Sequence, residues 1–148
     1  MTTIAVSRTE MACDSRVSWD AGEMVTVDDK VIRIGGDLVG ASGHTDSCLK
    51  FMDWYRTKGE RPEIEGDKSF EVVVLNKSGI YLYVNCFAPM RICEPIYAAG
   101  SGGMAAKAAM LCGKTPAEAV AIAIKCDKNS GGPVRTFSLQ GKRATTPA

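Results

Sequence analysis

Thr2 stands directly behind Met1 and is followed by the short apolar segment Thr3-Ile4-Ala5-Val6. If Met1 is removed, the chain starts with a threonine that carries both a side-chain hydroxyl and a free α-amine. A hydroxyl is a poor nucleophile until a neighbouring base accepts its proton. An N-terminal amine has an ordinary pKa of about 7.7 to 8 and can accept that proton near neutral pH. The start of the chain therefore predicts a nucleophile and its base on one residue.

Five further segments carry residue types that could surround such a nucleophile. In chain order they are Cys13-Asp14-Ser15-Arg16, Asp29-Lys30-Val31-Ile32-Arg33-Ile34, Gly40-Ala41-Ser42-Gly43-His44-Thr45-Asp46, Gly100-Ser101-Gly102-Gly103 and Asp127-Lys128-Asn129-Ser130-Gly131-Gly132. Taken together, from Thr2 to about Leu139, they resemble the proteasome β subunits and, more closely, the bacterial HslV peptidase. Those proteins are N-terminal nucleophile hydrolases, in which the mature threonine attacks a peptide carbonyl.

The resemblance implies a catalytic role for six residues, carried over position by position. They are the nucleophile Thr2, the charged pair Asp14 and Lys30 beside it, and a network around the terminal amine made by Ser101, Asp127 and Ser130. The chain is then expected to be a threonine-type peptidase, provided that Met1 is removed, and to need no cofactor.

Lys30 is notable in its own sequence context. The alternation of residues 27–34 places Lys30 on one face of a strand together with Ile32 and Ile34. Charged side chains are seldom fully buried unless they are paired, and the resemblance gives Asp14 as the partner. An ammonium beside Thr2 would make the amine lose its proton more readily and would offset negative charge on the attacked oxygen. The alternative is that Lys30 extends from a half-exposed strand into water.

The two glycine-containing segments near Ser101 and Ser130 also have structural explanations. The first fits a turn from a strand into a helix, where free amides could hold a phosphate, but it lacks the lysine of a P-loop and the spacing of a dinucleotide site. The second fits the left-handed end of a helix, which explains its glycines but not the Asp-x-x-Ser spacing. The resemblance instead places Ser101, Asp127 and Ser130 beside the terminal amine.

By the same resemblance, the loop Ala41-Ser42-Gly43 supplies a backbone N–H to the oxyanion. The family usually has glycine at the position of Ser42. The added hydroxymethyl group must therefore fit beside the substrate, or it narrows the approach or forces a different backbone angle. Ser18 and Ser42 are expected to flank an extended substrate strand through main-chain hydrogen bonds.

The resemblance also implies a pocket for the side chain that precedes the scissile bond. Its expected lining consists of Asp28, Ile32, Gly40, His44 and Cys48. Gly40 would leave the floor open to a large side chain, and Asp28 would favour a basic one.

The composition indicates one domain and excludes two classes of partner. The chain has 148 residues, of which 45% are hydrophobic, enough to bury about two-thirds of its unfolded surface. We predict a single domain over residues 1–139 and a flexible tail over residues 140–148. The net charge is +1 with interspersed signs, which gives no footprint for nucleic acid or a membrane surface. No membrane span or export signal is recognisable, so the expected location is the cytoplasm.

The six cysteines are expected to be reduced and buried, because they lie singly in apolar segments and no C-x-x-C motif occurs. They are Cys13, Cys48, Cys86, Cys93, Cys112 and Cys126. His44 is the only histidine, so His44 and Cys48 offer two ligands where zinc needs three or four. A Cys-His protease is a weakly supported alternative, because the sequence offers a single histidine.

Periodicity and turn signals predict strands at 3–7, 11–13, 30–34, 38–41, 70–75, 80–84, 96–99 and 134–139, with a hairpin turn at 76–79. Helices are predicted at 44–56, from 103 to about 111, and from Thr115, where Thr115, Pro116 and Glu118 form a start signal. This pattern fits an α+β, four-layer αββα sandwich. A second long helix, usual in the family after the first, is missing because residues 58–67 are too short and broken.

Three functions remain open. The favoured one is a peptidase of peptides or unfolded proteins, assembled as a homo-oligomeric ring, with an ATPase unfoldase as a possible partner. The second is a catalytically silent ring or scaffold subunit. The third is an N-terminal nucleophile amidase that acts on a small molecule.

Overall fold

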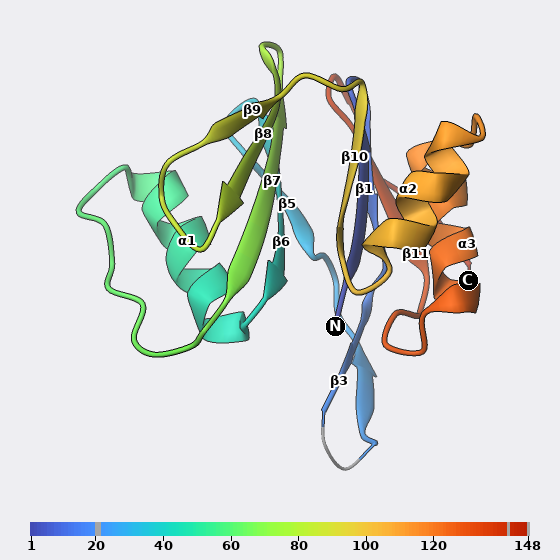
Figure 1. Ribbon diagram of the computed structural model, residues 1–148, viewed down its shortest axis with the longest axis horizontal. Helices are drawn as coiled ribbons and strands as arrows, with labels where there is room; N and C mark the ends of the chain where they lie inside the picture. The colour runs from blue at the N-terminus through green and yellow to red at the C-terminus, as the bar shows by residue number, and fades with distance from the viewer. Residues whose placement is uncertain (20–21, 142, 148) are drawn as a thin grey trace.

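Alternating apolar residues build two five-stranded antiparallel sheets in the computed structural model, which describes residues 1–19, 22–141 and 143–147. The first sheet has the order β10 (Ile96–Gly100), β1 (Thr3–Ser7), β2 (Glu10–Cys13), β11 (Val134–Ser138) and β12 (Arg143–Thr146). The second has the order β5 (Val31–Ile34), β6 (Asp37–Gly43), β7 (Phe70–Asn76), β8 (Gly79–Val84) and β9 (Met90–Ile92). The sheets lie face to face in the middle of the molecule (Figure 1).

The main core lies between the two sheets. Along β1, Ile4 and Val6 face the second sheet, whereas Ala5 points the other way. Along β7, Val73 and Leu75 face the first sheet. Successive strand residues point to opposite faces, so each of these strands contributes to two apolar layers at once.

Two helices cover the outer face of the first sheet (Figure 1). They are α2 (Gly103–Leu111) and α3 (Pro116–Cys126). Small residues such as Ala5 and Ala12 let them pack closely on the sheet. The predicted start of α3 is confirmed as a capping box, in which Glu118 N donates to Thr115 Oγ1 and Thr115 N donates to Glu118 Oε1.

One helix of the described chain, α1 (Thr45–Thr57), covers the outer face of the second sheet. Phe51 of α1 is fully buried and packs against Phe70, Tyr83 and Phe87. Phe87 lies in the loop after β8, and Ile64, from the segment where the second helix is missing, joins the same cluster. The expected four-layer αββα sandwich with one helix absent is confirmed. Side chains from loops cover part of the outer face of the second sheet, where the absent helix would lie.

The structure also contains strands that the sequence pattern did not predict. A separate two-stranded ribbon, β3 (Arg16–Ser18) with β4 (Met24–Thr26), projects from the same end of the sandwich as the N-terminus (Figure 1). The short strand β9 lies at the edge of the second sheet.

The C-terminal segment, which the sequence predicts to be a flexible tail, contains β12, in which Thr145 lies opposite Arg135 and Arg143 opposite Phe137. Threonine favours strands, and the exposed, polar character of this segment suits an edge. Lys142 and Ala148 of the same tail lie outside the described residues.

The expectation of buried cysteines holds only in part. All six thiols are unbridged, but only Cys13 is buried and Cys48 half-buried. The expectation is wrong for the other four, which are exposed because they fall at the ends of elements or in loops: Cys86, Cys93, Cys112 and Cys126. Among the described residues, no helix has both the length and the apolar composition needed to cross a bilayer.

Candidate active site

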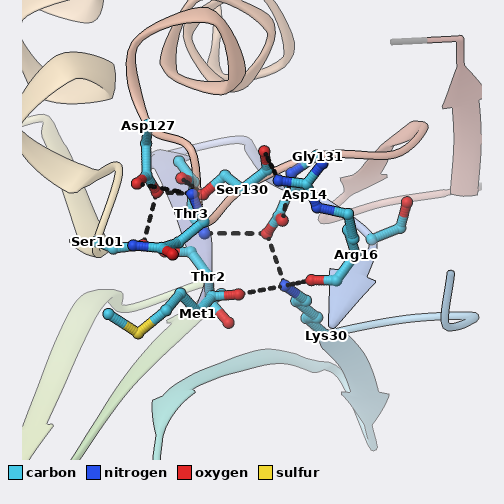
Figure 2. A network of polar contacts seen from close by, with 12 residues as sticks. Met1, Thr2, Thr3, Asp14, Arg16, Lys30, Ser101, Asp127, Ser130 and Gly131 are labelled. Carbon is cyan, nitrogen blue, oxygen red and sulfur yellow. Dashed lines mark hydrogen bonds and ion pairs between the residues drawn. The ribbon is translucent and has the colours of Figure 1, made fainter. Parts of the chain in front are cut away.

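Polar side chains from distant parts of the chain meet at the first residues of β1 (Figure 2). Strand β1 runs antiparallel to both β10 and β2, with Thr3 opposite Gly100 and Ile4 opposite Cys13. Ser101 and Asp14, which follow these partner strands, therefore lie on either side of the start of β1. The loop between α3 and β11 brings Asp127 and Ser130 to the same place, and Lys30 arrives just ahead of β5.

Asp14 is completely buried and accepts three hydrogen bonds. Its Oδ1 accepts from Thr3 N at 2.9 Å and from Lys30 Nζ at 3.0 Å, and its Oδ2 accepts from Gly131 N at 3.0 Å. A buried carboxylate is tolerated only when it is paired and hydrogen-bonded. These donors meet that need and hold Asp14 in one position.

Lys30 uses all three hydrogens of its ammonium. Besides Asp14, Lys30 Nζ donates to Met1 O at 2.8 Å and to Arg16 O at 2.6 Å (Figure 2). Its side chain is 7% exposed. Lys30 is therefore a buried cation fixed beside the peptide bond that joins Met1 to Thr2, and it does not extend into water.

Asp127 organises a second group of hydrogen bonds on the other side of β1. Ser101 Oγ and Ser130 Oγ each donate to Asp127 Oδ2 at 2.6 Å, and Asn129 N donates to Oδ1 at 3.1 Å. Burial acts to raise the pKa of Asp127, but the two hydroxyls, Asn129 N and the positive charge of the chain terminus outweigh it and hold the pKa below its ordinary value. The ionised carboxylate is thus the favoured form at neutral pH.

The hydroxyl of Ser130 connects Asp127 to Thr3 through hydrogen bonds. The two side-chain oxygens, Ser130 Oγ and Thr3 Oγ1, are 2.6 Å apart. Ser130 has one hydroxyl hydrogen, which it donates to Asp127, so Thr3 must be the donor in the Thr3–Ser130 bond. The structure therefore ties Ser130 to Thr3 while Met1 is attached.

Thr2 itself is nearly buried, at 9% exposure. Ser101 Oγ lies 3.3 Å from Thr2 O. The turn after β10 approaches so closely that a Cβ on Gly100, whose φ is +88°, would stand 2.0 Å from Thr2 O. Only glycine fits there, so the Gly100-Ser101 pair brings the Ser101 hydroxyl close to the backbone of Thr2.

The left-handed backbone of the β6 end lies at Gly43 and not at Ser42. Gly43 has φ +119°, and a Cβ there would stand 2.5 Å from Ser69 O. Ser42 is not among the residues with positive φ, so its hydroxymethyl group forces no unusual backbone angle. Ser42 pairs with Glu71 across the sheet, and Ser18 pairs with Met24 in the projecting ribbon.

An open cavity of about 400 Å³ lies beside Thr2 and Lys30. Its volume falls within the usual range of ligand pockets. Of the five expected lining residues, Ile32 and Cys48 line it, whereas Asp28, Gly40 and His44 do not. Gly40 faces the core instead, where an added Cβ would stand 3.1 Å from side-chain atoms of Ile4, Met11 and Val31.

Several lining residues escaped the sequence analysis. On α1 they lie on the same stripe of the helix as the expected Cys48: Thr45, Leu49, Met52, Asp53 and Arg56. That spacing marks one face of a helix, so the helical period of α1 was the signal that could have found them. Asp29, Val17 and Val27 complete the walls, and they lie in or beside the unpredicted ribbon.

Thr2 and Cys48 are the two candidate nucleophiles at this site. Burial raises the pKa of the Cys48 thiol to about 11, so this cysteine is protonated at neutral pH and is a poor nucleophile. Nowhere in residues 1–19, 22–141 and 143–147 do three or more His, Cys, Asp or Glu side chains gather as a metal ion would require. Thr2 has instead a fixed cation on one side and an ionised carboxylate with two hydroxyls on the other.

Comparison with known proteins supports the architecture. No family model and no curated protein matches the chain. Solved structures do match: BPH from Thiobacillus denitrificans in complex with epoxomicin has a TM-score of 0.71 at 21% identity, over 93% of this chain and 96% of that one. Eukaryotic HslV from Trypanosoma brucei has a TM-score of 0.70 at 17% identity, over 92% and 98%. The predicted HslV-type, N-terminal nucleophile hydrolase fold is confirmed.

Proposed function

We propose that this chain is a threonine endopeptidase, which hydrolyses peptide bonds with Thr2 as the nucleophile after Met1 has been removed. The observation that carries the proposal is the buried Lys30–Asp14 pair, whose ammonium lies within hydrogen-bond distance of the carbonyl that precedes Thr2. A buried cation at a chain start has little value for stability alone, because a buried ion pair is often no better than apolar packing. The Lys30 ammonium has a catalytic value beside a hydroxyl that must lose a proton.

In the proposed reaction, the α-amine of Thr2 accepts the hydroxyl proton as Thr2 Oγ1 attacks a peptide carbonyl. Negative charge then develops on the carbonyl oxygen and is stabilised by the backbone N–H of Gly43 and by the positive field of Lys30. The intermediate collapses by expelling the amine of the leaving peptide, which takes the proton from the Thr2 amine. Water, activated by the same amine, then hydrolyses the ester that remains on Thr2.

Ser101, Asp127 and Ser130 are proposed to orient the free amine. While Met1 is attached, Ser101 and Ser130 both donate to Asp127. A new amine at Thr2 would lie among these acceptors and donors, and the ionised Asp127 would favour its reprotonation during turnover. The substrate is proposed to extend between Ser18 and Ser42, with the side chain before the cleaved bond in the 400 Å³ cavity.

The direct test combines intact mass with labelling. Protein purified from its own host should lack the mass of Met1, and epoxomicin, the compound present in the T. denitrificans structure, should label it at Thr2. Thr2→Ala is the matched control and should take up no label. A chain that keeps Met1, takes no label and cleaves no peptide would overturn the proposal.

That outcome would instead favour the second candidate, a silent scaffold. One observation supports it: the carbonyl of Met1 accepts a hydrogen bond from Lys30, and Met1 lines a separate hollow of about 330 Å³ next to Ser42 and Ser101.

Assembly as a homo-oligomeric ring, served by an ATPase unfoldase, is part of the peptidase proposal. Light scattering should give a mass several times that of one chain. A stable, active monomer would overturn the proposed ring assembly, and the proposed threonine chemistry would still stand.

A further inference from the structure

An ion pair links the wall of the cavity to the C-terminal strand. Arg143 NH1, from β12, lies 2.8 Å from Asp29 Oδ2, and the two side chains are 43% and 22% exposed. Asp29 lines the cavity beside Thr2. The sequence analysis expected a carboxylate here from Asp28, but the side chain of Asp28 is exposed and lies outside the cavity.

The second oxygen of Asp29 has no partner within residues 1–19, 22–141 and 143–147. Asp29 Oδ1 is buried and accepts no hydrogen bond from the described part of the chain. Arg143 is therefore the cation that Asp29 contacts among the described residues. A carboxylate in such a setting becomes costly if its one counter-ion is removed, unless another cation replaces it.

The other charges around the cavity balance in sign. Lys30 is paired with Asp14, and α1 contributes Asp53 and Arg56, one of each sign. Most of the remaining lining is apolar, with Val17, Val27, Ile32 and Met52 among it. The cavity as a whole is thus close to neutral only while Arg143 neutralises Asp29.

We propose that Arg143 is a positioning residue that sets substrate specificity: by neutralising Asp29, it makes the cavity accept uncharged apolar side chains before the cleaved bond and disfavour basic ones. This inference rests on the proposed peptidase function and names its substrate class. Arg143 acts through Asp29 and touches neither Thr2 nor the reacting carbonyl. Leucine-type substrates are therefore cleaved in preference to arginine-type substrates by the unmodified chain.

The test compares kcat/KM for two peptides that differ only in leucine or arginine before the cleaved bond. Arg143→Gln should raise the arginine-to-leucine ratio by about fivefold to tenfold, the size expected for one partly screened charge. Arg143→Lys should keep the original ratio because it keeps the charge. Adding Asp29→Asn to Arg143→Gln should restore the ratio, since no carboxylate is then left to attract arginine.

Arg33→Gln is the matched control for loss of a distant positive charge. Arg33 also holds the C-terminal segment, through bonds to Ser138 O, Leu139 O and Gly141 O, but it does not line the cavity. It should leave the ratio unchanged. A purely structural role for Arg143 would lower both kcat/KM values by one common factor, which contradicts the inference.

A binding experiment separates this inference from the proposed function. In the Thr2→Ala background, NMR titration with N-acetyl-leucine amide and N-acetyl-arginine amide measures the affinity of the cavity for each side chain without turnover. In Arg143→Gln, the ratio of the affinity for the arginine amide to that for the leucine amide should rise as the kcat/KM ratio does. An unchanged ratio, an equal change in Arg33→Gln, or no binding of either amide overturns the charge-neutralising role. Absence of cleavage and labelling in the unmodified chain overturns the peptidase instead, and the titration still decides the role of Arg143.

Discussion

Thr2 and Thr3 are neighbours with the same side chain and different surroundings. Thr3 donates its hydroxyl to Ser130 and its amide to Asp14, and its carbonyl accepts from Asp14 N, so all three of its polar groups serve the structure. Thr2 lines the cavity next to Lys30. The proposed chemistry therefore depends on Thr2, and Thr3 holds the strand that presents it.

Thr2→Ser should keep the hydroxyl and the amine and retain measurable activity, whereas Thr2→Ala should lose it. The reason is that serine supplies the same nucleophile and alanine supplies none. Peptide cleavage and epoxomicin labelling, measured on protein whose N-terminus has been verified by mass, check this. Equal activity in Thr2→Ala and the unmodified chain would place the nucleophile elsewhere.

Lys30→Met should lower stability by about 3–5 kcal/mol, because it leaves the buried Asp14 without its counter-ion. The measurement is urea denaturation. Lys30→Met combined with Asp14→Asn should recover much of that stability and yet remain inactive. Recovery of activity in the double variant would show that the pair is structural.

Asp127→Asn should be less stable than the unmodified chain above about pH 5. The pKa of Asp127 in the folded state lies below its ordinary 3.8, so the ionised group stabilises the fold above that value. The contribution shrinks as the pH falls from 3.8 towards the lower folded-state pKa. Denaturation of both proteins at a series of pH values should therefore show a difference that narrows in acid, and a constant difference would contradict this account.

At the scale of single residues, sequence reasoning located the residues that meet around Thr2 better than those that line the cavity. Asp14 and Ser130 were placed beside Thr2 by the resemblance of their short segments to a known family, and no local pattern placed them there. Gly40 failed because its orientation depends on the register of β6 against β5, and a one-residue difference in that register exchanges the two faces of a strand. Asp29 and Arg143 meet across 114 positions, which no local pattern encodes.

At the scale of elements, α1 depends on its aromatic face. Phe51→Ala should destabilise the chain by about 3–5 kcal/mol, the usual cost of deleting a buried aromatic ring. Leu49→Ala on the same helix is the control, because Leu49 is 64% exposed, and it should change stability by less than about 0.5 kcal/mol. Chemical denaturation measures both, and similar losses would mean that α1 packs differently.

Elements with clear apolar patterning were predictable, including the four-residue strands β2 and β5, whereas four other short strands were not. Strand β1 and helix α2 begin and end where the sequence places them, because apolar periodicity and glycines mark them clearly. The ribbon β3–β4, β9 and β12 span three or four residues each, and none of them contains a buried residue that would mark a core-facing side. Their strand character comes from partners that lie far away or at an edge.

At the scale of the whole molecule, a buried thiol in the core between the sheets can report when the two sheets separate. Cys13 is fully buried there, and burial raises the pKa of its thiol to about 12. An aromatic disulfide reagent should modify Cys13 only when the sheets separate, at a rate set by the free energy of unfolding. Cys86, which is exposed, is the fast-reacting reference. Equally rapid modification of both thiols would mean that the sheets part locally.

The donors that surround Asp14 belong to the first strand, to the start of the second sheet and to a loop 117 positions away. Thr3 and Lys30 lie 11 and 16 positions from Asp14, whereas the bond from Gly131 closes a loop of 117 positions and carries the largest loop-closure cost of the three. A chain that ends before Gly131 would leave Asp14 Oδ2 without this donor. Under the proposed function, the candidate site is therefore complete only once the loop at Gly131 has been made.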